Sequence, residues 1–254
     1  MKQNILDNED KEWFMRFRWF FTSHGLLVIG GKNAKQNELI IKEYANKDDL
    51  VLHTEMPGSP FCIIKSKPTD KPIDFNKKSK KISKQDIEEA AIFCACFSQA
   101  WKKKLNQVSV SVFKPTQIYK TKRMPTGTFG IRGKCNTINV RLELAISMQH
   151  GKIRAVPLSA ATRYKLDGYR YWAIITPGDL PKEQATKIIG KKIKQDPLLF
   201  FEISKRSIKT LLHKKISKSK EAIKELEIWK REEEIMQALP AGKFDIRKIA
   251  EYKE

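Results

Sequence analysis

The chain has 254 residues, of which 41% are hydrophobic and 31% charged, which is ordinary for a globular protein with a buried core. Fifty lysines and arginines against 29 acidic residues give a formal net charge of +21 at pH 7, which favours polyanionic partners. The polar N-terminus argues against a secreted protein, and no apolar run approaches the roughly 20 residues that cross a bilayer. The chain has only four cysteines, which argues against a disulfide-rich protein. We therefore expect a soluble cytoplasmic protein.

After a polar leader over residues 1–12, the first predicted element is a hairpin. The segment WFMRFRWFF, residues 13–21, alternates as a strand does and places Arg16 and Arg18 on one face. His24 and Gly25 supply a turn before the apolar residues 26–29. Arginines interleaved with aromatic rings can contact phosphates and stack on unpaired bases, so the pattern favours an RNA surface. The alternative is that the arginines simply occupy the wet face of a structural hairpin.

The next elements are a short helix and a second hairpin. Asn33 is a candidate N-cap for a helix that reaches Tyr44. Strands are predicted at Leu50–Thr54 and Phe61–Lys65, joined by the turn sequence EMPGSP. Residues 66–84 are lysine-rich with two prolines, which predicts an exposed loop that is either merely solvated or a mobile arm that follows phosphates.

The strongest helix signal runs from Ser83 to Leu105. Ser83 and Asp86 form a capping pattern, and apolar residues such as Ala90, Cys94 and Trp101 recur at helical spacing, so we expect this stripe to be core.

Further strands complete the predicted sheet. They are expected at residues 108–119, 127–131, 140–146 and 169–175, with an irregular passage between 151 and 168. The predicted fold is α+β, with a mixed, mainly antiparallel sheet and packed helices over residues 13–178. Residues 179–254 form a basic C-terminal extension in which we expect two or three helices.

Three ordered blocks carry a family resemblance. They are WFMRFRWFFTSHGLLVIGGKNAKQNELIIKEYANKDDLVLHTEMPGSPFCIIK at 13–65, EEAAIFCACFSQAWKKKL at 88–105 and VFKPTQIYKTKRMPTGTFGIRGKCN at 112–136. They resemble the opening, the central helix and the later strand pair of the NFACT-R domain, the RNA-binding module of NEMF-type ribosome-quality-control proteins. Full-length members also carry an N-terminal NFACT domain, a helix-hairpin-helix segment and a coiled coil, for which this chain has no room. The resemblance therefore implies RNA binding, with any tailing of nascent chains left to a separate NFACT-N subunit.

Catalytic signals are thin. The sequence has no Walker loop, dinucleotide fingerprint or His-Glu-x-x-His motif. His53 and Glu55 share a face of a predicted strand, and His24 is a candidate third member of an acid-base or metal group; RNA contact and structural hydrogen bonding are the alternatives. Cys94 and Cys96 diverge on a helix and do not chelate one ion easily. We expect no catalytic residue, metal or cofactor.

The expected RNA-binding residues cluster at strand ends and turns, beside glycines that let a phosphate backbone approach. They are Arg16, Arg18, His24, Lys32, His53, Lys120, Lys122, Arg123, Arg132 and Lys134. The alternative is that the glycines serve a bulge and the charges are only solvated.

Three functions follow from these observations. The first is a non-catalytic RNA-binding protein of ribosome-associated quality control, whose partners are tRNA or ribosomal RNA on the large subunit. The second is an accessory that presents RNA to a separate tRNA-modification enzyme. The third is an RNA-processing nuclease or transferase that uses His53 and Glu55.

Overall fold

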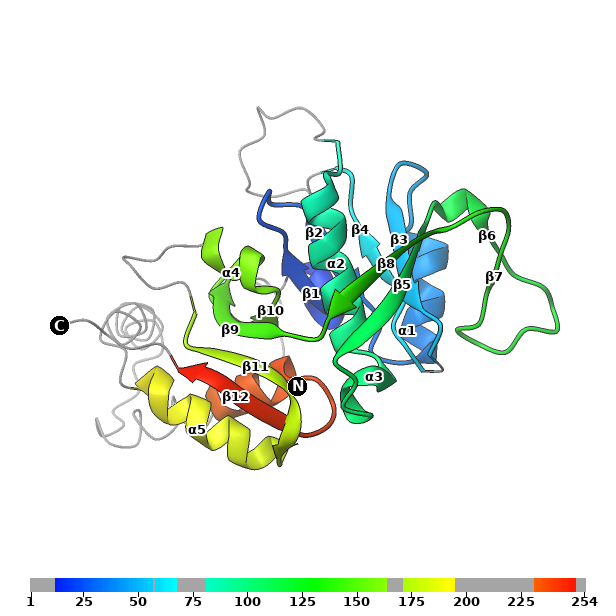
Figure 1. Cartoon of the computed structure of the whole chain (residues 1–254). Helices are drawn as coiled ribbons and strands as arrows, with labels where there is room; N and C mark the ends of the chain where they lie inside the picture. The colour runs from blue at the N-terminus through cyan, green and yellow to red at the C-terminus, as the bar shows by residue number, and fades with distance from the viewer. Residues whose placement is uncertain (1–11, 57, 68–80, 164–170, 195–230, 250–254) are drawn as a thin grey trace, which may run out of the picture. The chain divides into compact units, whose positions relative to one another are not determined.

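The computed structural model describes residues 12–56, 58–67, 81–163, 171–194 and 231–249 (Figure 1). The chain forms two compact units. The first comprises Met1–Ala100 and Gln107–Arg141, and the second comprises Trp101–Asn106 and Leu142–Glu254. Within the described residues, no helix has the length and apolarity needed to cross a membrane.

The first unit is built on a six-stranded sheet in the order β1-β2-β4-β3-β5-β8. Its strands are β1 (Arg18–Phe21), β2 (Leu27–Gly30), β3 (Leu50–Thr54), β4 (Cys62–Ile64), β5 (Gln107–Phe113) and β8 (Asn136–Arg141). Every neighbouring pair is antiparallel, and Leu52 in the sheet centre pairs with Cys62 on one side and Val112 on the other. This confirms both predicted hairpins and the α+β class.

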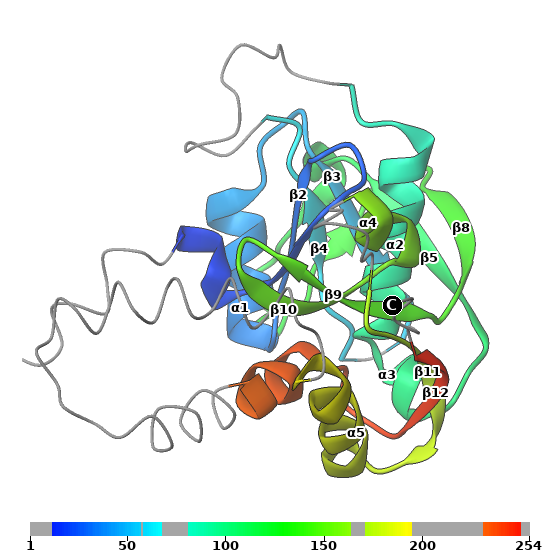
Figure 2. The same cartoon turned by 90° about the vertical axis from the view of Figure 1, so that its left-hand side faces the viewer.

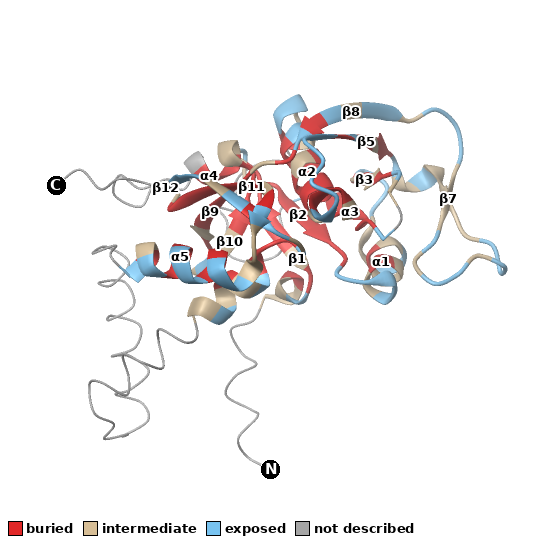
Figure 3. Ribbon diagram, turned by 60° about the horizontal axis from the view of Figure 1, so that its bottom comes forward, coloured by how far each residue is buried: buried red, intermediate tan, exposed pale blue. Residues whose placement is uncertain are grey.

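The N-terminal segment corrects the predicted long strand. Trp13–Arg16 is a 3-10 helix, η1, and only residues 18–21 pair in the sheet. The aromatic side chains of residues 14, 17, 19, 20 and 21 are all buried, whereas Arg16 is exposed; Figure 3 shows β1 coloured as buried. Phe14 packs edge to face on Trp19 at 5.0 Å and on Phe21 at 5.5 Å between ring centroids. A regular strand over residues 13–21 would bury the rings of one face only. The 3-10 helix is favoured because it allows more of the rings to be buried, and each ring contributes a large apolar area.

The turn and the first helix follow the local sequence signals. Gly25 adopts a φ of 82°, the left-handed conformation that glycine tolerates and the β1–β2 turn requires. Helix α1 (Ala34–Leu39) begins where the Asn33 side chain accepts a hydrogen bond from the Gln36 amide at 2.9 Å. A π-helical turn, η2 (Ile40–Tyr44), continues it, so the helix predicted from Asn33 to Tyr44 is confirmed with a change of winding.

The central helix is shorter than predicted. Helix α2 (Lys84–Cys96) starts with the predicted capping box of Ser83 and Asp86 and packs on β3, β4, β5 and β8 (Figure 1). It ends at residue 96 because the Ser98 hydroxyl donates to the Ala95 carbonyl at 2.7 Å and accepts from the Ala100 amide at 3.1 Å. A separate short helix, α3 (Gln99–Lys102), follows.

A small two-stranded hairpin leaves the first unit's main sheet. The predicted strand over 108–119 breaks after Phe113 at a 3-10 turn, η3 (Pro115–Gln117), since proline at that position cannot donate to a sheet ladder. Strands β6 (Ile118–Tyr119) and β7 (Gly130–Ile131) then pair as a separate hairpin with an exposed tip (Figure 3). We call residues 118–134 the basic hairpin.

The second unit holds a four-stranded antiparallel sheet in the order β10-β9-β11-β12. Its elements are β9 (Leu144–Gln149), β10 (Lys152–Val156), α4 (Leu158–Arg163), β11 (Ala173–Leu180), α5 (Lys182–Lys194), a helix over 231–238 and β12 (Phe244–Ile249). Figure 2 shows α5 beside the 231–238 helix, where Thr186 donates to the Met236 sulfur at 3.8 Å.

Several predictions for this unit change. The strand predicted at 140–146 is split between β8 and β9, and the passage predicted as irregular contains β10 and α4. The proposed domain boundary near residue 178 falls inside β11, which β12 extends from the far end of the chain. Residues 179–254 therefore include a strand as well as helices, while the stretch 195–230 and most of the lysine-rich loop, 68–80, lie outside the described residues.

Candidate nucleic-acid interface

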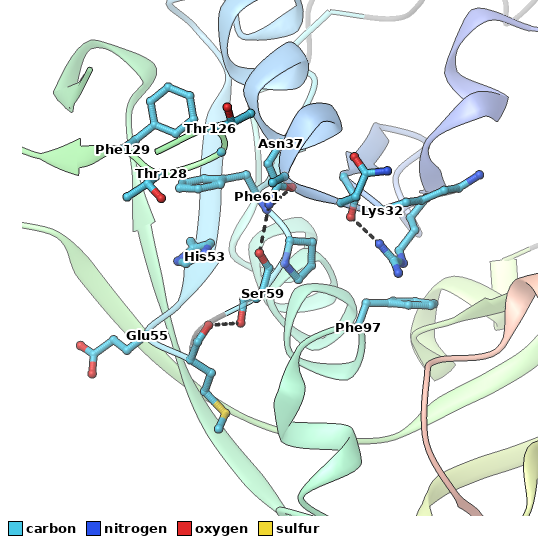
Figure 4. Close-up of a pocket in the computed structure, with 18 of the residues that line it drawn as sticks. Lys32, Asn37, His53, Glu55, Ser59, Phe61, Phe97, Thr126, Thr128 and Phe129 are labelled. Atoms are coloured by element: carbon cyan, nitrogen blue, oxygen red, sulfur yellow. Dashed lines mark hydrogen bonds between the residues drawn. The ribbon is translucent and has the colours of Figure 1, made fainter. Parts of the chain in front are cut away.

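A pocket of about 440 Å³ opens in the first unit beside the basic hairpin (Figure 4). Segments from distant parts of the chain line it: Arg18 on β1, residues 31–37, the β3–β4 connection, Phe97 after α2, and residues 126–131 of the hairpin. The six-stranded sheet brings two of these segments together, because Leu52 on β3 pairs with Cys62 on β4, so His53 and Phe61, the residues next to this pair, lie side by side.

One wall of the pocket is aromatic. The His53 ring stacks on Phe61 with centroids 4.2 Å apart and an interplanar angle of 23°, and Phe129 meets Phe61 edge to face at 5.5 Å. We call these three rings the aromatic wall. Burial lowers the pKa of His53 to about 4, against the opposing effect of a hydrogen bond with the Ser59 backbone. The His53 ring is therefore uncharged at pH 7.

The loop that carries Phe61 is held by hydrogen bonds. The Asn37 amide group donates to the Ser59 carbonyl at 3.2 Å, and its oxygen accepts from the Phe61 amide at 3.1 Å. The Ser59 hydroxyl donates to the Met56 carbonyl at 2.6 Å. These bonds fix the aromatic wall before any ligand arrives.

The two N-terminal arginines have separate surroundings. The Arg18 guanidinium donates to the Gly31 carbonyl and lies 5.2 Å from the centroid of the Phe97 ring, inside the pocket lining, where burial lowers its pKa. Arg16 is exposed and contacts Tyr44, both through the tyrosine hydroxyl and over its ring. The shared strand face predicted for these arginines is wrong, because Arg16 belongs to η1.

His24 lies at a different place from His53 and Glu55. Its Nδ1 is 3.2 Å from a carboxylate oxygen of Asp86 and 3.2 Å from the Ser83 hydroxyl, at the start of α2. Glu55 is exposed and lines the pocket together with His53. The predicted pair thus lines one pocket, although the Glu55 carboxylate points away from the His53 ring (Figure 4), and His24 is not in the pocket lining.

The basic hairpin carries a set of exposed cations. They are Lys122, Arg123, Arg132 and Lys134. The Arg132 guanidinium lies 4.6 Å from the centroid of the Tyr119 ring, and the Gln117 amide group donates to the Arg132 and Lys134 carbonyls at 3.0 and 2.9 Å. The backbone that carries Arg132 and Lys134 is therefore held by hydrogen bonds, while their charged groups are exposed.

Lys120 points inward instead. Its ammonium donates to the Glu38 carboxylate at 2.7 Å and to the carbonyls of Pro125 and Thr128 at 2.8 and 3.2 Å. It also lies 4.9 Å from the Phe129 ring centroid. An ammonium group has three hydrogens to donate, so these contacts hold the hairpin tip together.

Glu38 on α1 anchors the hairpin. One of its carboxylate oxygens accepts from Lys120 and from the Gly127 amide, each at 2.7 Å, and the other lies 2.8 Å from Lys42. Hydrogen bonds from Lys120, Lys42 and Gly127 lower the pKa of Glu38 to about 2. The carboxylate is thus ionised across the physiological range and keeps the hairpin tip docked on α1.

Lys32 lies at the pocket edge, exposed, with its backbone amide donating to Gln36 at 3.0 Å. Cys94 is fully buried, and burial raises the pKa of its thiol, which donates to the carbonyls of Leu52 and Pro60. The described residues contain no group of three or more His, Cys, Asp or Glu side chains arranged to hold a metal ion.

Sequence reasoning missed several residues of the site. Phe61, Phe97 and Phe129 line the pocket, and Glu38 anchors the hairpin. Phe129 had a local signal, since it is a large ring between Thr128 and Gly130, close to the turn of the hairpin. The other three carry no such signal, because their role depends on contacts across the sheet.

Comparison with known proteins places the first unit in a family. Residues 16–133 match the family model of the NFACT protein RNA binding domain. The Archaeal Rqc2 homolog aRqcH of Methanocaldococcus jannaschii is 31% identical over 194 residues, which cover 74% of this chain and 26% of that protein. The mouse Ribosome quality control complex subunit NEMF is 35% identical over 133 residues, covering 49% of this chain and 11% of that protein.

The curated relatives are much longer than this chain. It spans about a quarter of the archaeal relative and about a ninth of the mouse one. In the solved C-terminal part of the fibronectin/fibrinogen-binding protein from Streptococcus suis, 45% of the chain aligns with 49% of this one at a TM-score of 0.40 and 23% identity, too distant a likeness to support an argument. The family match, together with the similarity to the archaeal and mouse proteins, shows that the chain belongs to the NFACT-R family and carries its RNA-binding domain at residues 16–133.

Proposed function

We propose that this chain is a non-catalytic RNA-binding protein that acts in ribosome quality control and binds tRNA or large-subunit ribosomal RNA. The observation that carries the proposal is the match of residues 16–133 to an RNA-binding family, over the same segment that presents the basic hairpin. A net charge of +21 supports it, because cations on the protein displace the counterions of a phosphate backbone.

The exposed hairpin cations are the proposed phosphate contacts. Arginine offers a forked set of donors that matches phosphate oxygens, and lysine offers a point charge. Gln117 donates hydrogen bonds to the backbone carbonyls of Arg132 and Lys134, so the backbone positions from which these two side chains extend are set before RNA binds. We propose an NFACT-N protein or an RNA-modifying enzyme as a partner subunit of this chain.

The first test measures RNA affinity as a function of salt for the full chain and for Arg132→Ala and Lys134→Ala. Each variant should weaken binding to tRNA and should lower the slope of log affinity against log salt by about 1, because one phosphate contact is lost. Lys47→Ala, which removes an exposed lysine outside the basic hairpin, is the matched control and should leave the slope unchanged.

RNA crosslinking in cells with the same variants would identify the ligand. Discrete crosslinks on tRNA or on large-subunit RNA that vanish in the Arg132→Ala, Lys134→Ala double variant support the proposal and name the RNA. Diffuse crosslinks that survive the double variant, with the salt slope unchanged, would reject the hairpin as the binding surface.

A further inference from the structure

The pocket beside the basic hairpin differs in chemistry from the hairpin itself. Its aromatic wall of His53, Phe61 and Phe129 carries no charge at pH 7, whereas the hairpin presents exposed lysines and arginines. Phosphates are bound by cations, and bases stack on flat rings. The hairpin therefore matches the phosphate of a nucleotide, and the aromatic wall matches its base.

A short turn connects these two surfaces. Residues 126–129 line the pocket, and they lie between Arg123 and Arg132 in the basic hairpin. Because Lys120 and Glu38 fasten this turn to α1, the distance between the pocket and the hairpin charges is set by the fold. The pocket and the hairpin charges are therefore neighbours in the folded unit.

The pocket has the size and polar groups that a base requires. Its volume of about 440 Å³ lies within the range of roughly 300–1,000 Å³ that is usual for small-ligand sites. Thr126 and Thr128 at its hairpin side have hydroxyls, which both donate and accept hydrogen bonds, as base edges do. At the other side, the Arg18 guanidinium lies over Phe97, and Lys32 stands exposed at the edge.

We propose that this pocket receives one unpaired nucleobase of the bound RNA, stacked against the aromatic wall, while the basic hairpin holds the flanking phosphates. The inference rests on the proposed function and specifies its ligand: single-stranded RNA, or a loop of a folded RNA, from which one base turns into the protein. Paired bases are already stacked within a duplex, so the pocket selects for unpaired nucleotides.

The test uses a short single-stranded oligoribonucleotide in which a fluorescent base analogue, quenched when it stacks, is placed at each position in turn. Anisotropy reports total binding to the full chain, and emission reports stacking. With the wild type, we expect quenching at one position of the bound probe. Phe129→Leu keeps apolar bulk against Phe61 but removes the ring, so it should abolish this quenching and weaken binding about tenfold, with the salt slope unchanged.

Three further variants separate the pocket from the rest of the site. Phe129→Trp retains an aromatic face and should restore quenching, which a purely structural role for Phe129 does not predict. His53→Leu should lose quenching as Phe129→Leu does. The Arg132→Ala, Lys134→Ala double variant should weaken binding and lower the salt slope, yet keep the quenching at saturation. Circular dichroism melts confirm that each variant is folded.

Two outcomes would overturn the inference alone: RNA binds with the expected salt dependence but no position is quenched, or quenching persists in both Phe129→Leu and His53→Leu. Absence of RNA binding by the wild type would reject the proposed function and the inference together. If the protein cleaves the probe and the cleavage requires His53 and Glu55, the inference is also overturned, because the pocket would then be a catalytic site.

Discussion

At the scale of single residues, the contacts of each cation decide what it does. Arg18 is turned toward the Gly31 carbonyl and the Phe97 ring, and Lys120 donates to Glu38 and to two carbonyls of its own hairpin. The charged groups of both side chains are therefore already engaged in contacts within the protein. The exposed cations of the hairpin are better placed for phosphates, since Lys122, Arg123 and Lys134 are exposed and Arg132, though it lies over the Tyr119 ring, is exposed as well.

His53 gives a pH-dependent stability. Its folded pKa of about 4 lies below the ordinary value of 6.5, so the unfolded chain binds a proton that the folded chain excludes. The His53 contribution to stability is therefore present above pH 6.5 and is lost as the pH falls toward 4. Between pH 7 and pH 5 we expect a loss of about 2 kcal/mol from this group.

Urea unfolding at the two pH values checks this expectation, and His53→Phe is the matched control. The phenylalanine keeps a ring against Phe61 but does not titrate, so this variant should lack the His53 component of the pH dependence. An imidazole NMR titration with a midpoint near 6.5 would show that the burial of His53 has no effect on its protonation.

At the scale of elements, the basic hairpin depends on a close approach to α1. Gly127 has a φ of 75°, and a Cβ atom there would lie 2.7 Å from the Ala34 carbonyl oxygen. Gly133 has nearly the same φ of 77°, but a Cβ atom there would meet only the Gln117 side chain at 3.6 Å. Substituting alanine at each glycine therefore distinguishes the cost of a positive φ, which both positions share, from the cost of a steric clash, which arises only at Gly127.

Gly127→Ala should loosen the hairpin more than Gly133→Ala. Positive φ alone costs about 1 kcal/mol for alanine, and the clash at Gly127 raises the total to about 2 kcal/mol. Hydrogen–deuterium exchange of hairpin peptides should then accelerate roughly 30-fold for Gly127→Ala and about fivefold for Gly133→Ala. Equal acceleration would mean that contact with α1 does not hold the hairpin.

At the scale of the whole molecule, the second unit takes part of its core from the chain that precedes β5. Trp101 is buried, donates from its indole Nε1 to the Lys243 carbonyl at 2.9 Å, and packs on Phe244 with centroids 5.5 Å apart. Residues 101–106 therefore join β12 at the other end of the chain, and the second unit is assembled from segments far apart in sequence.

Trp101→Leu should destabilise the second unit by about 3 kcal/mol through lost apolar burial and an unpaired carbonyl. Trp101→Phe keeps a ring and should cost about 1 kcal/mol, chiefly for the lost indole donor. Hydrogen exchange of β11 and β12 amides measures both effects, with β1 and β2 amides as the internal reference. Equal loss of protection in all four strands would show that the two units unfold as one.

Much of the first unit was predictable, because its signals are local. Asn33 and Ser83 cap helices through bonds to amides only three residues away, and Gly25 supplies a turn that its own backbone freedom permits. The end of α2 and the breaking of the predicted strand over 140–146 were missed. The end of α2 depends on short-range competition for backbone hydrogen bonds at Ser98, and the stretch 140–146 is divided because β8 pairs with β5 whereas β9 pairs with β10 and β11; apolar periodicity reports neither.

The sequence by itself determined the family, the α+β class, the hairpins and the basic character of the molecule, since periodicity, capping and charge are properties of neighbouring residues. Only the tertiary structure decided that Arg18 and Lys120 are committed to protein contacts, and that His53, Phe61 and Phe129 form one wall. Such choices arise from many weak contacts between segments that the sheet brings together, and no local pattern encodes which distant partner a side chain meets.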